Sequence, residues 1–126
     1  MLFDTDVLIW ALRGDRRAAA ALDKADRLDL SVVSYMELIQ CARDKKELHS
    51  VRAYLADVGF HILPLSENIG HRASVYIEEY ALKSGLAIAD ALIAATAAEG
   101  QVALCSGNAK YYRAIAEVEL HVFRAS

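Results

Sequence analysis

The chain has 126 residues, of which 56% are hydrophobic, and a formal net charge of −3. This length suits one domain with its own core, spanning residues 1–126, and no Gly-, Ser- or Pro-rich stretch predicts a linker. The net charge gives no general attraction for nucleic acid, and no apolar run reaches the roughly 18 residues of a membrane span. Acids precede the first apolar run, so we expect no secretory signal and a cytoplasmic location.

Short apolar runs and helical patterns alternate along the chain. In the first half, the expected order is a strand at 2–4, helices at 7–14 and 16–26, a strand at 28–33, a helix from Ser34 to about Ala42 and another from the charged run 43–47 to Val58. In the second half, it is a strand at 60–63, a helix from Ser66 to 84–85, an apolar helix around Asp90, a strand at 102–106, a short helix through Tyr111, Tyr112 and Ile115, and a strand at 120–123. This alternation predicts an α/β fold with a parallel sheet that is covered on both faces.

Asp90 is the most unusual residue in the chain. From Ser84 to Ala98 every other side chain is uncharged, and most are Ala, Ile or Leu, so we expect a helix that is buried on all sides. An isolated ionised carboxylate is costly there, and it must be protonated, used as a helix cap, paired with a cation or bound to a metal ion.

Sites in parallel sheets lie beyond the carboxyl ends of the strands, and this rule selects Asp4, Glu37, Asn108 and Asp90. Each residue also has a structural explanation. Asp4 or Asp6 can cap the first helix, Asn108 can cap the helix after it, and Asp90 can cap a helix that begins at Ala91. Ser34 and Glu37 fit the S-x-x-E capping box.

Taken together, the capping explanations are weaker. Three carboxylates gathered at one sheet edge without matching Lys or Arg residues repel one another unless a divalent cation lies between them. Carboxylate oxygens select hard ions such as Mg²⁺ or Mn²⁺. Such an ion can activate water and stabilise charge on a phosphodiester, so the acids indicate phosphodiester hydrolysis.

Other residue types point to no competing chemistry. The four His residues show no zinc spacing, and Ser106 lacks the surroundings of a serine nucleophile. Cys41 and Cys105 are expected to be buried reduced thiols. Arg13 and Lys110 follow proposed site residues and are weak candidates for contacts with RNA phosphates, although a solvated face explains either one.

Four segments in this order resemble the PIN-domain family, and within it the VapC toxins of toxin–antitoxin pairs. They are LFDTDVLIW (2–10), SYMELIQ (34–40), IADALIAATA (88–97) and LCSGNAKYY (104–112). The resemblance implies a three-layer α/β/α fold with a central sheet of four to five strands, and a Mg²⁺- or Mn²⁺-dependent endoribonuclease that leaves a 5′-phosphate. It also implies a cognate antitoxin protein and a homodimer, with Asp4, Glu37 and Asp90 as the metal-binding carboxylates.

Three features depart from the pattern of that family. Many members have an acid where this chain has Asn108, and a Thr where it has Ser106. We expect Asn108 and Ser106 to orient a bound water or a second ion, because an amide brings no charge. The aromatic position that follows is usually Phe and is Tyr111-Tyr112 here, a change that we expect to alter packing more than chemistry.

Two other classes of protein share parts of this pattern. A phosphoacceptor receiver module needs an Asp at the end of its third strand, where this chain has Leu63-Pro64-Leu65. A PIN-like interaction module without activity remains the alternative, in which the acids act only as caps.

Overall fold

The computed structural model describes residues 1–126 and is organised around a five-stranded parallel sheet with the order β3-β2-β1-β4-β5. The strands are β1 (Leu2–Phe3), β2 (Asp29–Ser31), β3 (His61–Leu63), β4 (Leu104–Ser106) and β5 (Leu120–Val122). The helices are α1 (Thr5–Leu12), α2 (Arg16–Lys24), α3 (Val32–Gln40), α4 (Lys45–Val58), α5 (Glu67–Ser84), α6 (Ile88–Gly100) and α7 (Ala109–Tyr112). The predicted α/β fold with a parallel sheet is confirmed.

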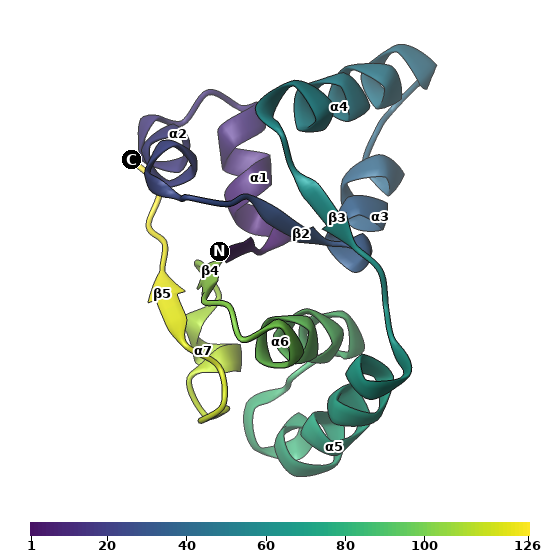
Figure 1. Cartoon of the computed structure of the whole chain (residues 1–126), viewed down its shortest axis with the longest axis vertical. Coiled ribbons are helices and arrows are strands. Elements are labelled where there is room, and N and C mark those ends of the chain that lie inside the picture. Colours follow the sequence, from purple (N-terminus) through teal and green to yellow (C-terminus); the bar gives the residue numbers. More distant parts are fainter.

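Helices cover both faces of the sheet and make three layers (Figure 1). α1 to α4 lie on one side of the strands, and α5, α6 and α7 lie on the other. α6 lies between the sheet and α5, so it is enclosed by structure on two sides. This position explains why Ala91 and the run from Ile93 to Ala97 are buried. The expectation of complete burial is wrong at the first turn, where Ile88 is 72% exposed.

Successive residues of the central strands supply two separate apolar cores. Leu2 and Leu104 belong to the core beneath α5 and α6, whereas Phe3 and Cys105 belong to the core beneath α1 to α4. This division follows from the alternation of side chains across a strand. The two short strands β1 and β4 are therefore held from both faces.

The ends of several helices are where the sequence predicts them. The side chain of Asp44 caps α4, and the side chain of Ser66 caps α5 by accepting a hydrogen bond from the backbone N–H of Ile69 at 3.1 Å. Gly59 and Gly85 end the same two helices with φ angles of 92° and 75°. Glycine suits these positions because it adopts positive φ without steric cost.

Two sequence-based expectations about the α3 region are wrong. The helix begins at Val32, and its cap is Ser31, whose hydroxyl accepts from the N–H of Val33 at 3.1 Å. Ser34 is buried within the helix, so Ser34 and Glu37 do not form a capping box.

Cys41 is exposed just after the helix, while Cys105 is the buried thiol that we expected. None of the helices combines the length and apolar character needed to cross a membrane.

The order of the strands identifies where a site should lie. From β1 the chain builds β2 and β3 on one side, and it later returns to add β4 and β5 on the other. In sheets of this kind, the crevice at the carboxyl ends of the strands where the order reverses is the usual ligand site. Here that crevice lies between β1 and β4.

The cap of α5 gives a direct test of the helix assignments. Replacing Ser66 with Ala removes the hydrogen bond to Ile69 and should lower the free energy of unfolding by about 1 kcal/mol. Ser74→Ala is the matched control, because Ser74 is exposed within the same helix and Ala is the better helix former. Urea denaturation measures both, and equal stability of the two variants would contradict the assignment of the cap.

Candidate active site

Asp4 is the most buried acid of the crevice, with 3% of its surface exposed directly after β1. Its Oδ1 accepts a hydrogen bond from the N–H of Thr5 at 2.8 Å, so it caps α1 as the structural explanation required. Its Oδ2 accepts from the Ser106 hydroxyl at 2.6 Å and from the Tyr112 hydroxyl at 3.2 Å. Capping therefore accounts for only one of its three hydrogen bonds.

Asp90 meets Asp4 across the crevice from the first turn of α6. Its Oδ2 accepts from the N–H of Ala87 at 3.2 Å, and its Oδ1 accepts from the Tyr112 hydroxyl at 3.4 Å. The expected alternative, a cap for a helix starting at Ala91, is wrong because α6 begins three residues earlier, at Ile88. Burial raises the pKa of Asp90, the hydrogen bond from Ala87 opposes this, and the charge of Asp4 raises it further.

Asp6 adds a third acid next to Asp4. Its Oδ1 accepts from the N–H of Val7 at 2.9 Å and its Oδ2 from the N–H of Gly107 at 2.8 Å. Burial and the charge of Asp4 raise its pKa to about 6, against the effect of both hydrogen bonds. A Cβ atom at residue 107 would lie 2.6 Å from Oδ2 of Asp6, so only glycine allows this close approach.

Glu37 lies on α3 and approaches the same edge through Thr5. The Thr5 hydroxyl donates to Oε1 of Glu37 at 2.7 Å and lies 2.9 Å from the hydroxyl oxygen of the buried Ser34. Thr5 therefore links Asp4 to Glu37, through its backbone N–H on one side and its hydroxyl on the other. Glu37 is half-buried and points to no basic partner.

Ser106 and Asn108 follow the neighbouring strand β4 and have different environments. Ser106 is fully buried, and its oxygen accepts from the N–H of Asn108 at 3.0 Å while its hydroxyl donates to Asp4. Ser106 thus orients Asp4. The side chain of Asn108 is exposed and makes no capping hydrogen bond to α7, so the capping explanation is wrong for this residue.

The two basic candidates lie at different distances from the acids. Lys110 is exposed in α7, with its ammonium 4.8 Å from the centroid of the Tyr111 ring. Arg13 follows the last residue of α1, an eight-residue helix that spans about 12 Å, and Asp4 precedes its first residue. The structure therefore places Lys110 on α7, the helix that also carries Tyr112, and Arg13 at the other end of α1 from Asp4, against the ring of Trp10.

No ion pair of the chain involves Asp4, Asp6, Glu37 or Asp90. Their negative charges are balanced only by hydrogen-bond donors. The side chains do not already form a closed ligand shell, because no three His, Cys, Asp or Glu side chains converge tightly enough to hold a metal ion. The crevice is therefore an acidic site with oxygen donors and without a resident cation from the protein.

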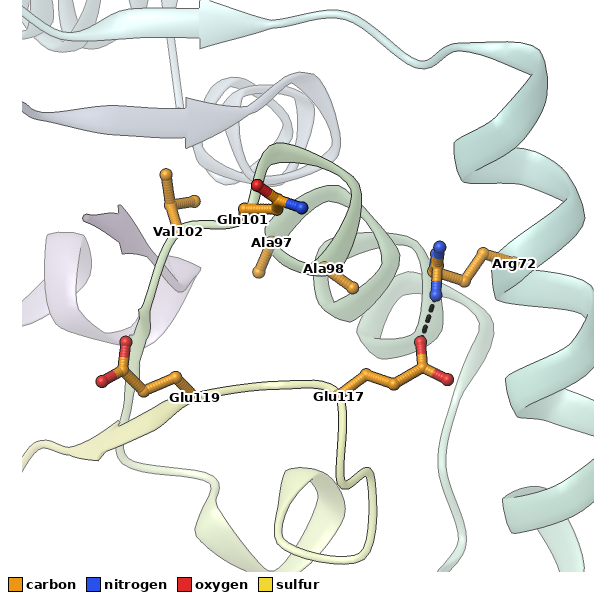
Figure 2. Close-up of a pocket in the computed structure, with 7 residues that line it drawn as sticks. All are labelled: Arg72, Ala97, Ala98, Gln101, Val102, Glu117 and Glu119. Atoms are coloured by element: carbon orange, nitrogen blue, oxygen red, sulfur yellow. Dashed lines mark hydrogen bonds and ion pairs between the residues drawn. The ribbon is translucent and has the colours of Figure 1, made fainter.

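A pocket of about 420 Å³ lies at the opposite end of α6, and Figure 2 shows the residues that line it. Arg72 forms ion pairs with Glu99 and Glu117, and Glu117 also accepts a hydrogen bond from Tyr76 at 2.8 Å. Two of the carboxylates here share one cation, Arg72, whereas the acids of the crevice have none. Asp90 and Gln101 stand eleven residues apart on a helix, or about 16 Å, so this pocket is separate from the acid cluster.

A known protein family matches nearly the whole chain. The model of the PIN domain matches residues 1–117. The chain belongs to the PIN domain family. All four segments that carry the sequence resemblance lie within the matched range. No curated protein sequence matches this PIN domain.

Solved structures give the same fold. A chain of a toxin–antitoxin complex from Klebsiella pneumoniae is 30% identical, with 93% of each chain covered and a TM-score of 0.79. FitAcB from Neisseria gonorrhoeae is 25% identical, with 94% of each chain covered and a TM-score of 0.73. VapBC-1 from nontypeable Haemophilus influenzae is 21% identical, with 96% of each chain covered and a TM-score of 0.81. The resemblance to the PIN-domain family is confirmed, and the chain shares its fold with the VapBC structure.

The structure adds two residues to the site that the sequence did not select. Asp6 was one of two possible caps for the first helix, and it is a half-buried acid that interacts with the charge of Asp4. Tyr112 was expected to affect packing, but its hydroxyl reaches both Asp4 and Asp90. The sequence signal for Tyr112 was the aromatic pair Tyr111-Tyr112 close after Asn108. Only the three-dimensional structure shows that Tyr112 is the one that faces the acids.

The titration of Asp6 tests this electrostatic description. Because the folded state raises its pKa from 3.8 to about 6, the stability contributed by protonated Asp6 is fully present below pH 3.8 and is lost as the pH rises through about 6. Side-chain ¹³C NMR in EDTA should find a midpoint near 6, and Asp4→Asn should lower it because one repelling charge is gone. An Asp6 midpoint that does not change in Asp4→Asn would contradict the proposed coupling.

Proposed function

We propose that this PIN domain is the toxin of a toxin–antitoxin pair and that it hydrolyses RNA phosphodiester bonds with Mg²⁺ or Mn²⁺. The observation that carries the proposal is the meeting of Asp4 and Asp90 at the β1–β4 crevice without a balancing Lys or Arg. Like charges at such close range are unfavourable unless a proton or a cation is shared between them.

The donor set fits a hard cation better than a soft one. Every candidate ligand is a carboxylate or amide oxygen, and Mg²⁺ prefers oxygen. Mg²⁺ commonly keeps several waters and takes one or two carboxylates, which suits a site whose side chains do not form a closed shell. Asp4 and Asp90 would hold the ion directly. Glu37 would join after its carboxylate turns from Thr5, or would bind one of the waters.

When bound, such an ion supplies an activated water and stabilises negative charge on the phosphodiester. The remaining residues orient a metal-binding carboxylate or bind water and RNA. Ser106 keeps Asp4 in place, the exposed amide of Asn108 can hold a water or an RNA group, and Lys110 can contact a phosphate. Arg13 would contact only RNA that extends along α1.

The partner proposal rests on the structural relatives and on two surfaces. The similar structure from Klebsiella pneumoniae is a toxin–antitoxin complex. We propose that this chain also has a cognate antitoxin and that it acts in the cytoplasm. A mainly apolar hollow of about 280 Å³ between α1, α3 and α4 is large enough for antitoxin side chains. A homodimer is proposed because Leu82 is fully exposed and Ile88 is 72% exposed beside the α5–α6 groove.

The alternative is a PIN domain that binds partners without cleaving RNA. One observation favours it: Asp4 and Asp90 each accept a hydrogen bond from a backbone N–H at a helix start, so each has a structural use. This alternative does not explain why Asp4 and Asp90 share the Tyr112 hydroxyl in a crevice without cations.

RNA cleavage separates these functions. Purified protein should make discrete cuts in total RNA with Mg²⁺ or Mn²⁺ and none in EDTA. Asp90→Asn should reduce cleavage by at least roughly 100-fold, because loss of a ligand exceeds the effect of losing a supporting partner. Its metal-free melting temperature should equal or exceed that of the wild type, since a repelling charge is removed.

Asp57→Asn is the matched control, because Asp57 is exposed on α4 and should leave cleavage unchanged. Wild-type cleavage by Asp90→Asn would show that the cuts come from another site or from a contaminant. Absence of any cleavage, with no effect of Mg²⁺ on melting, would favour the interaction module.

A further inference from the structure

Tyr112 is placed where its hydroxyl serves both acids of the crevice. Its ring is fully buried in the core with α5 and α6, and its hydroxyl lies 3.2 Å from Oδ2 of Asp4 and 3.4 Å from Oδ1 of Asp90. No other group in the structure forms hydrogen bonds with both carboxylates. The two distances exceed the usual 2.7–2.8 Å of an O–H···O bond, as expected when one proton is shared by two acceptors.

The buried ring and the hydroxyl have separable roles. A phenylalanine at residue 112 would fill the same space in the core and lack the hydroxyl. Tyr76 offers a contrast within the chain, because its hydroxyl donates to Glu117, which is also paired with the cation of Arg72. At Asp4 and Asp90 there is no such cation, and the shared phenol is the sole hydrogen-bond link between them.

The hydrogen bonds leave room for a cation on both carboxylates. A carboxylate has about four lone-pair positions. Asp4 uses three of them, for Thr5, Ser106 and Tyr112, and Asp90 uses two, for Ala87 and Tyr112. Each acid is therefore oriented by donors and keeps at least one lone-pair position that no donor uses.

We propose that the Tyr112 hydroxyl is a positioning group that fixes the Asp4 and Asp90 carboxylates relative to each other and thereby sets the affinity of the crevice for a divalent cation. This inference rests on the proposed function. Asp4 follows a strand and Asp90 belongs to a helix of the opposite layer, so their separation depends on packing between layers unless a third group links them. Hydrogen-bond partners of metal ligands act in this way in other metal sites.

Isothermal titration of the full chain with Mn²⁺ tests the inference. Tyr112→Phe should retain the fold and bind Mn²⁺ roughly 10- to 100-fold more weakly than the wild type. Tyr111→Phe is the matched control, because the hydroxyl of this half-buried neighbour makes no hydrogen bond, and it should bind with wild-type affinity. Unchanged or tighter Mn²⁺ binding by Tyr112→Phe would overturn the positioning role.

A measurement on the wild-type protein covers the case in which Tyr112→Phe does not fold. The ¹³Cζ resonance of Tyr112 should shift on addition of Mg²⁺, with a midpoint equal to the Mg²⁺ dissociation constant from calorimetry, while that of Tyr111 should not. A Tyr112 resonance whose chemical shift does not change when Mg²⁺ binds would contradict the inference. Absence of metal binding by the wild type would overturn the proposed metal site as well, so the two failures are distinguishable.

Discussion

The rest of the site depends on a single carboxylate, Asp4, that is almost fully buried at the end of the central strand without a cation. Burial is the main reason that the pKa values of Asp6, Asp90 and Tyr112 are raised, and the charge of Asp4 raises all three further. An unpaired buried charge is costly, and here three hydrogen-bond donors offset part of that cost. A cation bound in the crevice, as proposed above, would offset the rest of that cost.

The fold provides the means to hold this charge. β1 has strands on both sides and helices on both faces, so the backbone that carries Asp4 is fixed in all directions. β4 brings Ser106 beside it, and α6 and α7 bring Asp90 and Tyr112 from the other layer (Figure 1). The reversal in strand order between β1 and β4 leaves this edge open to ligands.

Much of the fold is readable from the sequence because local signals and packing agree. Asp44, Ser66, Gly59 and Gly85 have the chemistry of helix ends and are found there. The α3 region fails because Val32 and Val33 favour strand by propensity, whereas packing places them in a helix capped by Ser31. Local propensity cannot show this, since the deciding contacts come from distant residues.

The site is only partly predictable for a related reason. The position after a strand selects Asp4, and an apolar setting selects Asp90, without any structure. The packing of α7 against α6 determines that Tyr112, and not Tyr111, faces these acids. The direction of α1 determines that Arg13 lies far from them. Spacing along the sequence contains neither piece of information.

The central claim is that Asp4 and Asp90 together bind a divalent cation. Crystals grown with Mn²⁺ test it through anomalous diffraction, which locates the metal independently of activity. We predict one strong anomalous peak in the β1–β4 crevice, bonded to a carboxylate oxygen of Asp4 and to one of Asp90. Full Mn²⁺ occupancy elsewhere with an empty crevice would contradict the account, and the acids would then be structural.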